Sequence, residues 1–105
     1  EDWMFDKKFE TIHVDDLDEI INDIELIDIR ETYEYRAGHI KGAKNIPISE
    51  LLKDTGNYLK KDKEYHIICQ GGSRSKMACD KLAQDGFKVV DVAGGTASYL
   101  GSLEV

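Results

Sequence analysis

Cysteine, proline and long apolar runs are scarce in this sequence, and each scarcity excludes a class of protein. Two cysteines among 105 residues are too few for the disulfide framework of a small secreted domain. No apolar stretch approaches the length of about 20 residues that a transmembrane helix needs. The formal net charge is -7, which argues against nucleic acid or an anionic membrane as a partner. We therefore expect no nucleic-acid partner, no membrane partner and a reducing, cytoplasmic location.

The single proline and the absence of low-complexity segments or internal repeats leave no candidate linker between domains. A chain of 105 residues, 41% of them hydrophobic, has enough apolar surface for one core. We interpret residues 1–105 as one domain. The first residues lack the basic and apolar regions of a signal peptide, and position 1 is not methionine. Residues 1–8 are interpreted as an N-terminal extension or the remnant of a tag.

Short β-branched runs alternate with amphipathic segments along the chain. The strands are predicted over residues 10–14, 25–29, 44–48, 65–68 and 88–92. The helices are predicted over residues 15–21 (capped by Asp15 or Asp16), 31–36, 49–55 and 75–85, with a short one opening at Thr96. Pro47 suggests that the third strand lies at a sheet edge. This alternation predicts an α/β fold, with a central parallel sheet of about five strands and helices on both faces.

Cys69 stands at the end of the fourth predicted strand, and a short glycine-bearing loop separates it from the next helix. Backbone N–H groups of such a loop can converge on one point, and the positive end of the helix dipole adds to them. A thiolate at that point is stabilised and acts as a nucleophile. The non-functional alternatives are a buried, unreactive cysteine at the end of a strand and an ordinary turn at Gly71 and Gly72.

Loops that leave the carboxyl ends of parallel strands meet at one edge of a sheet, where open α/β sheets bind ligands. We expect the Cys69 loop, residues 30–38 and the Gly94-Gly95 turn at that edge. A basic rim there would attract a small anion. The alternative is that these charges pair with neighbouring carboxylates on a solvated face; both interpretations stay open for Arg30 and Arg36. The basic residues of this region are Arg30, Arg36, His39, Lys41 and Lys44.

Three segments together resemble the signatures of rhodanese-like domains. Residues 26–47 carry the first signature, which includes Gly38-His39-Ile40, residues 69–75 match the active-site loop, and Gly94-Gly95 matches the closing glycine pair. The resemblance extends from about Phe9 to Leu100 in the right order and spacing. Tyr99 stands where many members carry tryptophan, which we interpret as a change in packing.

The resemblance implies a sulfurtransferase in which Cys69 is the nucleophile and carries a sulfane sulfur as a persulfide. The donor would be a small thiosulfate-like anion or a persulfide, and the acceptor would be cyanide, a thiol or a protein. Arg74 would orient or neutralise the anionic group of the donor; the alternative is that it only caps the helix or forms a salt bridge at the surface. This chemistry requires no metal and no organic cofactor. The cradle for the sulfur would be formed by the N–H groups of Gln70, Gly71, Gly72, Ser73, Arg74 and Ser75.

Two other functions are compatible with a cysteine in such a loop. Cysteine phosphatases and arsenate reductases also hold a thiolate before a helix, but their loops resemble a cysteine, five residues and an arginine. Here four residues separate Cys69 from Arg74, and a smaller ring of donors suits one sulfur atom better than a phosphate. The second alternative is a non-catalytic binding module, or a persulfide relay, within a larger system.

The remaining polar residues of interest are interpreted as structural. Cys79 shares the apolar stripe of the helix after the loop, which indicates core packing. Asp28, near the end of a buried strand, needs a partner such as Arg30 or a backbone N–H. His39 is expected to form a local hydrogen bond that fixes its turn. His13 and His66 are assigned to the architecture of their strands.

Overall fold

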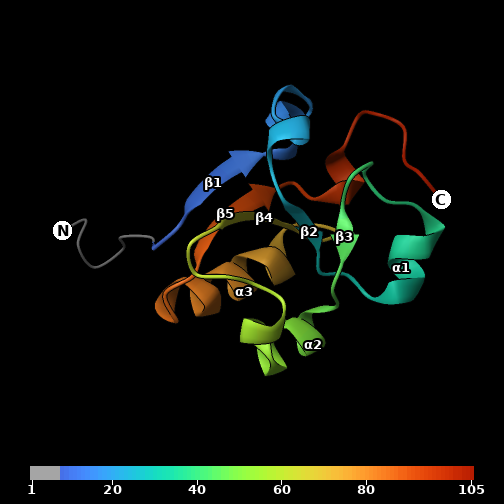
Figure 1. Ribbon diagram of the computed structural model, residues 1–105. Coiled ribbons are helices and arrows are strands. Elements are labelled where there is room, and N and C mark those ends of the chain that lie inside the picture. Colours follow the sequence, from blue (N-terminus) through green and yellow to red (C-terminus); the bar gives the residue numbers. More distant parts are fainter. Residues whose placement is uncertain (1–7) are drawn as a thin grey trace.

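A five-stranded parallel sheet forms the centre of the computed structural model, which describes residues 8–105 (Figure 1). The strand order is β1-β5-β4-β2-β3, and every neighbouring pair is parallel. The α/β prediction is therefore confirmed. The strands are β1 (Glu10–His13), β2 (Leu26–Asp28), β3 (Lys44–Asn45), β4 (Glu64–Ile68) and β5 (Lys88–Ala93).

Two apolar cores lie on opposite faces of the sheet because side chains alternate along each strand. In β4, Tyr65 and Ile67 belong to the core under α2 and α3, whereas Ile68 belongs to the other core. Short 3₁₀-helices and α1 cover that second face and its rim (Figure 1). The helices are η2 (Val14–Glu19), η3 (Ile21–Asp23), α1 (Thr32–Ala37), α2 (Ile48–Lys53), η4 (Thr55–Asn57), α3 (Ser73–Gln84) and η5 (Thr96–Ser98).

The first helical segment differs from its prediction. A 3₁₀-helix, η2, spans Val14–Glu19, and neither Asp15 nor Asp16 caps it. His13 is the capping residue instead: its backbone is extended, and its ring Nδ1 accepts the Asp15 N–H at 3.1 Å. An imidazole nitrogen can accept this hydrogen bond as a carboxylate would. The aspartates lie too late in the chain to cap this helix.

The segment predicted as a strand over residues 44–48 forms ladder pairs only at Lys44–Asn45. The edge position of this strand is confirmed, but Pro47 is not part of it. Pro47 is the capping residue before α2, where its backbone φ of -53° suits the start of a helix. Ile46 and Ile48 still donate backbone hydrogen bonds to Asp28 and Ile29, at 3.0 Å each, so the chain stays attached to β2 without forming a longer strand.

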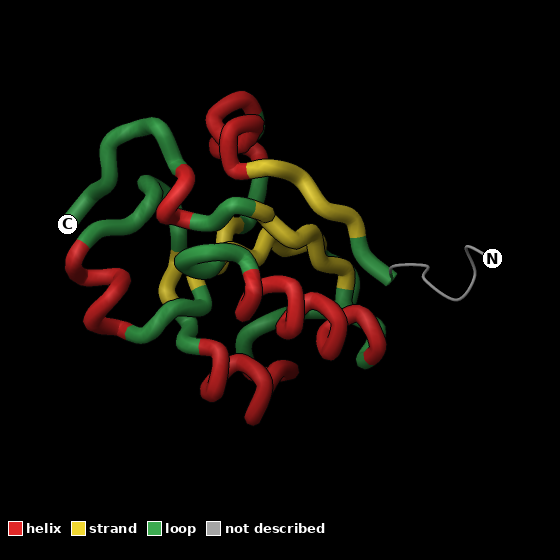
Figure 2. Tube along the Cα trace, turned by 180° about the vertical axis from the view of Figure 1, so that it is seen from behind, coloured by secondary structure: helices red, strands yellow, loops and turns green. Residues whose placement is uncertain are grey.

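The parallel arrangement brings three loops to one edge of the sheet. The chain leaves β2 toward Arg30, β4 toward Cys69 and β5 toward Gly94-Gly95. The C-terminal segment returns to the same side beside the loop after α1 (Figure 2). Its Glu104 exchanges two backbone hydrogen bonds with His39, at 2.8 and 2.9 Å. Among the described residues, no helix has the length and apolar character needed to cross a membrane.

Candidate active site

Cys69 follows β4 directly, and its sulfur is held by the backbone of the next turn. The N–H groups of Gly72 and Ser75 donate to Sγ at 3.1 and 3.2 Å. The Ser75 hydroxyl donates to the Gly72 carbonyl at 3.1 Å, which ties the loop to the first turn of α3. Cys69 and Ser75 are both fully buried. Two backbone N–H groups therefore hold the sulfur at the positive end of a 12-residue helix.

Helix α3 begins at Ser73, two residues earlier than predicted. Gly72 precedes it with a φ of +108°, a left-handed conformation that glycine adopts without a Cβ penalty. This turn directs the chain from the strand into the helix within three residues of Cys69. Ser73 and Arg74 consequently belong to the first helical turn.

The closing glycine pair supports the loop from the neighbouring strand. Gly95 has a φ of +66°, and a Cβ at this position would lie 2.4 Å from the Gln70 carbonyl oxygen. The following N–H groups, of Thr96 and Ala97, donate to the carbonyls of Cys69 and Gln70 at 2.9 and 3.0 Å. Only glycine allows this close approach of two backbones, so the pair determines how the Cys69 loop is seated.

Several donors of the loop are left without a protein acceptor. Within residues 8–105, no acceptor is found for the backbone N–H groups of Gln70, Gly71, Ser73 and Arg74. The first N–H groups of a helix have no acceptor within the helix itself. They are therefore available to an anionic group that approaches the loop.

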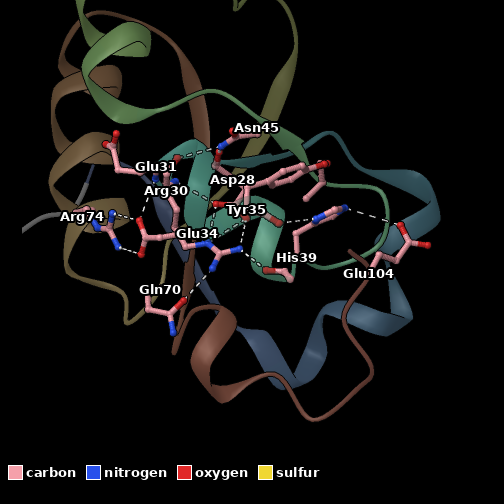
Figure 3. A network of polar contacts seen from close by, with 12 residues as sticks. Asp28, Arg30, Glu31, Glu34, Tyr35, His39, Asn45, Gln70, Arg74 and Glu104 are labelled. Carbon is pink, nitrogen blue, oxygen red and sulfur yellow. Dashed lines mark hydrogen bonds and ion pairs between the residues drawn. The ribbon is translucent and has the colours of Figure 1, made fainter.

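Arg30 is a buried cation rather than part of an exposed rim. It is 3% exposed, and its guanidinium pairs with the fully buried Asp28 through contacts of 2.9 to 3.2 Å (Figure 3). The backbone N–H of Arg30 also donates to Asp28 at 3.0 Å, so both partners expected for this carboxylate are present. Arg30 further donates to the Gly38 carbonyl at 2.8 Å and to Gln70 Oε1 at 3.0 Å. It thus links β2, the loop after α1 and the Cys69 loop.

Arg36 lies elsewhere. Its side chain is exposed in the last turn of α1, two positions beyond Glu34. Residues two apart on a helix do not share a face. The structure therefore brings Arg30 to the Cys69 loop, through Gln70, and leaves Arg36 outside the pocket described below.

Arg74 is engaged by a carboxylate of α1. Its Nη1 and Nη2 donate to the two carboxylate oxygens of Glu34 at 2.9 and 3.0 Å (Figure 3). This bidentate hydrogen bond lowers the pKa of Glu34 to about 2 and raises the pKa of Arg74. The guanidinium is thus paired with α1 and is not a free cation beside Cys69.

A pocket of about 330 Å³ opens beside the loop. Glu34, Arg30 and Gln70 contribute its polar wall, and Leu103 and Tyr99 contribute apolar surface. Cys69 does not line it, since the sulfur is enclosed by its own loop. The remaining lining residues are Ala37, Gly38, Thr96 and Ala97.

Glu34 and Leu103 contribute to this site but have little signal in the sequence. Glu34 lies 40 residues before its partner Arg74. Leu103 comes from the C-terminal segment and packs against Gly38. Glu34 does carry one local signal. Together with Glu31 it forms a capping box at the start of α1, a pattern of two acidic residues at a spacing of three. That pattern indicates a helix start, not an ion pair with the Cys69 loop.

The other singled-out residues have structural contacts. His39 Nδ1 lies 2.9 Å from the Tyr35 carbonyl, which confirms the expected local hydrogen bond. Its ring stacks on Tyr35 with centroids 3.7 Å apart. Cys79 is fully buried in the core under α3, as predicted, and burial raises the pKa of its thiol well above the usual range. His66 is buried within β4, and burial lowers the pKa of its imidazole.

The model of the family described as "Rhodanese-like domain" matches residues 13–102. The chain belongs to the rhodanese-like family. This rhodanese-like chain is 36% identical over 95 residues to "Putative sulfurtransferase YtwF" of Bacillus subtilis, covering 90% of this chain and 91% of that protein. It is 39% identical over 90 residues to "Putative sulfur carrier protein YrkF" of the same organism, covering 85% of this chain and 46% of YrkF. The chain thus spans about half the length of YrkF, and 64% of a further Bacillus subtilis relative, YqhL.

Solved structures agree with this assignment. A rhodanese-related protein from Thermoplasma volcanium has a TM-score of 0.79 and 40% identity, covering 88% of this chain and 91% of that one. A protein from Staphylococcus saprophyticus has a TM-score of 0.82 and 35% identity, covering 92% of this chain and 100% of that one. The rhodanese-like fold therefore accounts for nearly all of the described residues.

Proposed function

We propose that this rhodanese-like domain is a sulfurtransferase that carries a sulfane sulfur on Cys69. The observation that carries the proposal is the pair of N–H hydrogen bonds to Sγ, from Gly72 and Ser75. Two backbone donors and a helix N-terminus stabilise a thiolate without any further acid or base. The relatives named for sulfur transfer and sulfur carriage support the same chemistry.

In the first step, the Cys69 thiolate attacks the outer sulfur of the donor. The new bond joins Sγ to that sulfur, and the donor's S–S bond breaks, so its electron pair leaves with sulfite or with a thiolate. In the second step, cyanide or an acceptor thiolate attacks the outer sulfur of the persulfide. The S–S bond of the persulfide breaks and Cys69 leaves as a thiolate, with no net oxidation of the protein.

The loop can bind the Cys69 anion both as a thiolate and, after transfer of one sulfur atom, as a persulfide. After transfer the negative charge resides on the outer sulfur, farther from Gly72 and Ser75. The N–H groups without a protein acceptor, on Gln70, Gly71 and the first residues of α3, are donors for that charge. We propose that they form the outer part of the cradle. Arg74 lies in the same first turn of α3, with its guanidinium paired with Glu34.

Loading requires a movement of the loop, because Cys69 has no exposed surface. A donor sulfur can contact Sγ only when the residues above it shift. Gly71 is exposed, and a Cβ placed on it would meet nothing within 4 Å. We propose that the turn at Gly71 moves outward, while Gly95 holds the base of the loop. We propose a cytoplasmic setting for the cycle, since reducing conditions keep cysteine thiols from forming disulfides.

The test is the intact mass of the purified protein before and after incubation with excess thiosulfate or glutathione persulfide, and again after cyanide. The expected result is a gain of one sulfur atom that cyanide removes as thiocyanate. Cys69→Ser is expected to abolish this gain. Cys79→Ser is the matched control and is expected to load normally, because its thiol is buried in the core. No sulfur gain from any donor would favour a non-catalytic binding module, and a gain that persists in Cys69→Ser would overturn the assignment of the nucleophile.

A further inference from the structure

Arg74 is the cation that a small anionic donor would need, and it is already paired with Glu34. Both guanidinium nitrogens that point toward α1 are bonded to carboxylate oxygens, at 2.9 and 3.0 Å. The side chains of Glu34 and Arg74 are only 19% and 33% exposed. A bidentate, charge-assisted pair of this kind is stronger than an ordinary exposed ion pair. Any anion that binds Arg74 has to compete with Glu34 or share the guanidinium with it.

Within the described part of the chain, no second cation replaces Arg74 at the loop. Arg30, which reaches Gln70, is already neutralised by Asp28. Its remaining contacts are to a backbone carbonyl and an amide oxygen. The protein as a whole carries a formal net charge of -7, so long-range attraction does not favour a dianion either.

The pocket beside the loop has a different character from an anion site. Glu34 faces it with a carboxylate, and Leu103, Tyr99 and two alanines give it apolar surface. Its volume of about 330 Å³ leaves room for the organic group of a donor next to the Cys69 loop. Its lining is more polar than apolar, so it can contact both the polar and the apolar atoms of an organic group.

We propose that Glu34 determines donor specificity: it disfavours dianionic inorganic donors such as thiosulfate and leaves organic persulfides as the preferred class. This inference rests on the proposed sulfurtransferase function. An organic persulfide brings the transferable sulfur on an organic group, with no sulfonate-like group next to the reacting sulfur. It uses the backbone N–H donors of the loop and the pocket beside the loop, and it does not need the guanidinium of Arg74.

The transfer from such a donor balances without a further reactant. The Cys69 thiolate attacks the terminal sulfur of R–S–SH. The S–S bond of the donor breaks and its electron pair leaves as the thiolate R–S⁻. The proton of the terminal sulfur then passes to that thiolate, which leaves the Cys69 persulfide anion and R–SH. No sulfite forms, so no dianionic leaving group has to be stabilised by Arg74.

Glu34→Gln tests the proposal. Glutamine at this position keeps the capping box at the start of α1, in which the Glu34 side chain accepts the Glu31 N–H at 2.9 Å. It removes the negative charge and replaces the oxygen that accepts from Arg74 Nη2 by an NH2 donor, so the bidentate hold on the guanidinium is lost. The KM for thiosulfate is expected to fall by about tenfold, because a like charge no longer competes at the site. The kcat/KM for glutathione persulfide is expected to change by less than about twofold, because that donor bypasses Arg74.

Two controls separate this effect from a structural one. Glu50→Gln, an exposed residue of α2, makes the same change in net charge and is expected to leave both donors unaffected. Glu34→Asp keeps the charge and is expected to retain the high KM for thiosulfate. Equal changes for both donors in Glu34→Gln, or no change for either, would overturn the proposal and leave the pair a link between α1 and the loop.

The wild-type protein provides an independent measurement if a variant fails to fold. Its kcat/KM for glutathione persulfide is expected to exceed that for thiosulfate by at least about tenfold. A persulfidated carrier protein, assayed in parallel, shows whether the preferred donor is a small or a macromolecular persulfide. A preference for thiosulfate would overturn the inference about Glu34 but would leave the proposed sulfurtransferase function intact. A lack of Cys69 persulfide with every donor would instead refute the proposed function itself.

Discussion

Replacing Arg30 by methionine removes the cation that neutralises a fully buried carboxylate. Asp28 is 0% exposed and Arg30 is 3% exposed. Three guanidinium contacts to the carboxylate, at 2.9, 3.0 and 3.2 Å, would be lost. The Gly38 carbonyl and Gln70 Oε1 would lose their donors as well. Of these contacts to Asp28, only the backbone N–H of position 30, at 3.0 Å, would remain.

The expected loss of unfolding free energy is about 3–5 kcal/mol, the cost of leaving one member of a buried ion pair without its partner. The free energy of unfolding of a whole domain is about 5–15 kcal/mol. Arg30→Met would therefore leave the domain only marginally stable. The pair itself need not be strongly stabilising, because burying two charges costs nearly as much as their attraction returns. The double variant Asp28→Asn with Arg30→Met is therefore expected to be more stable than Arg30→Met alone.

The assay is urea-induced unfolding at pH 7, followed by far-ultraviolet circular dichroism. Lys81→Met is the matched control, since it breaks an exposed ion pair with Asp85 whose side chains are 56% and 42% exposed. It is expected to cost no more than about 0.5 kcal/mol. A loss below about 1 kcal/mol for Arg30→Met would refute the reasoning, because it would make the Asp28–Arg30 pair equivalent to a surface pair. So would a double variant as unstable as the sum of the two single ones.

Two further predictions concern the loop and its ion pair. Gly95→Ala is expected to cost at least about 2 kcal/mol in urea unfolding and to slow sulfur loading, since its Cβ would lie 2.4 Å from the Gln70 carbonyl oxygen at a φ of +66°. Gly71→Ala, whose Cβ meets nothing within 4 Å, should stay within about 0.5 kcal/mol; equal losses would contradict this account. The hydrogen bond from Arg74 lowers the pKa of Glu34 from 4.5 to about 2 in the folded protein. The ionised pair therefore stabilises the fold fully above pH 4.5 and loses this effect as the pH falls toward 2. The stability difference between wild type and Glu34→Gln, about 1 kcal/mol for a partly exposed pair, should be constant from about pH 7 to 5 and shrink below; a difference that grows on acidification would show that another group titrates.

The order of strands and helices could be predicted because each element has a local cause. Apolar β-branched residues mark β2, β4 and β5, and the apolar stripe of α3 includes Cys79 and Leu82. The predicted boundaries were wrong where a neighbouring segment decided them. Pro47 ends the short edge strand and caps α2 instead of extending β3. His13 takes over the capping role at η2, since its ring reaches the Asp15 N–H.

The cradle around Cys69 was recognisable because nearly all of it lies within seven consecutive residues. Gly72 and Ser75 supply their N–H groups from the same short turn, so the loop's chemistry is a property of local sequence. The contribution of Gly95 could also be expected, since parallel strands deliver their loops to one edge. Spacing alone does not reveal that its missing side chain makes room for the Gln70 carbonyl.

The sequence by itself determined the α/β order, the candidate nucleophile and the turn that holds it, because these depend on neighbours in the chain. Only the tertiary structure decided the charge around that cysteine. The sequence left open whether Arg30 and Arg74 are free or paired. Packing buries Arg30 against Asp28 and pairs Arg74 with Glu34, 40 residues away. The free energy of a charge depends on what surrounds it in space, and those surroundings are assembled from α1, the Cys69 loop and the C-terminal segment only when the chain has folded.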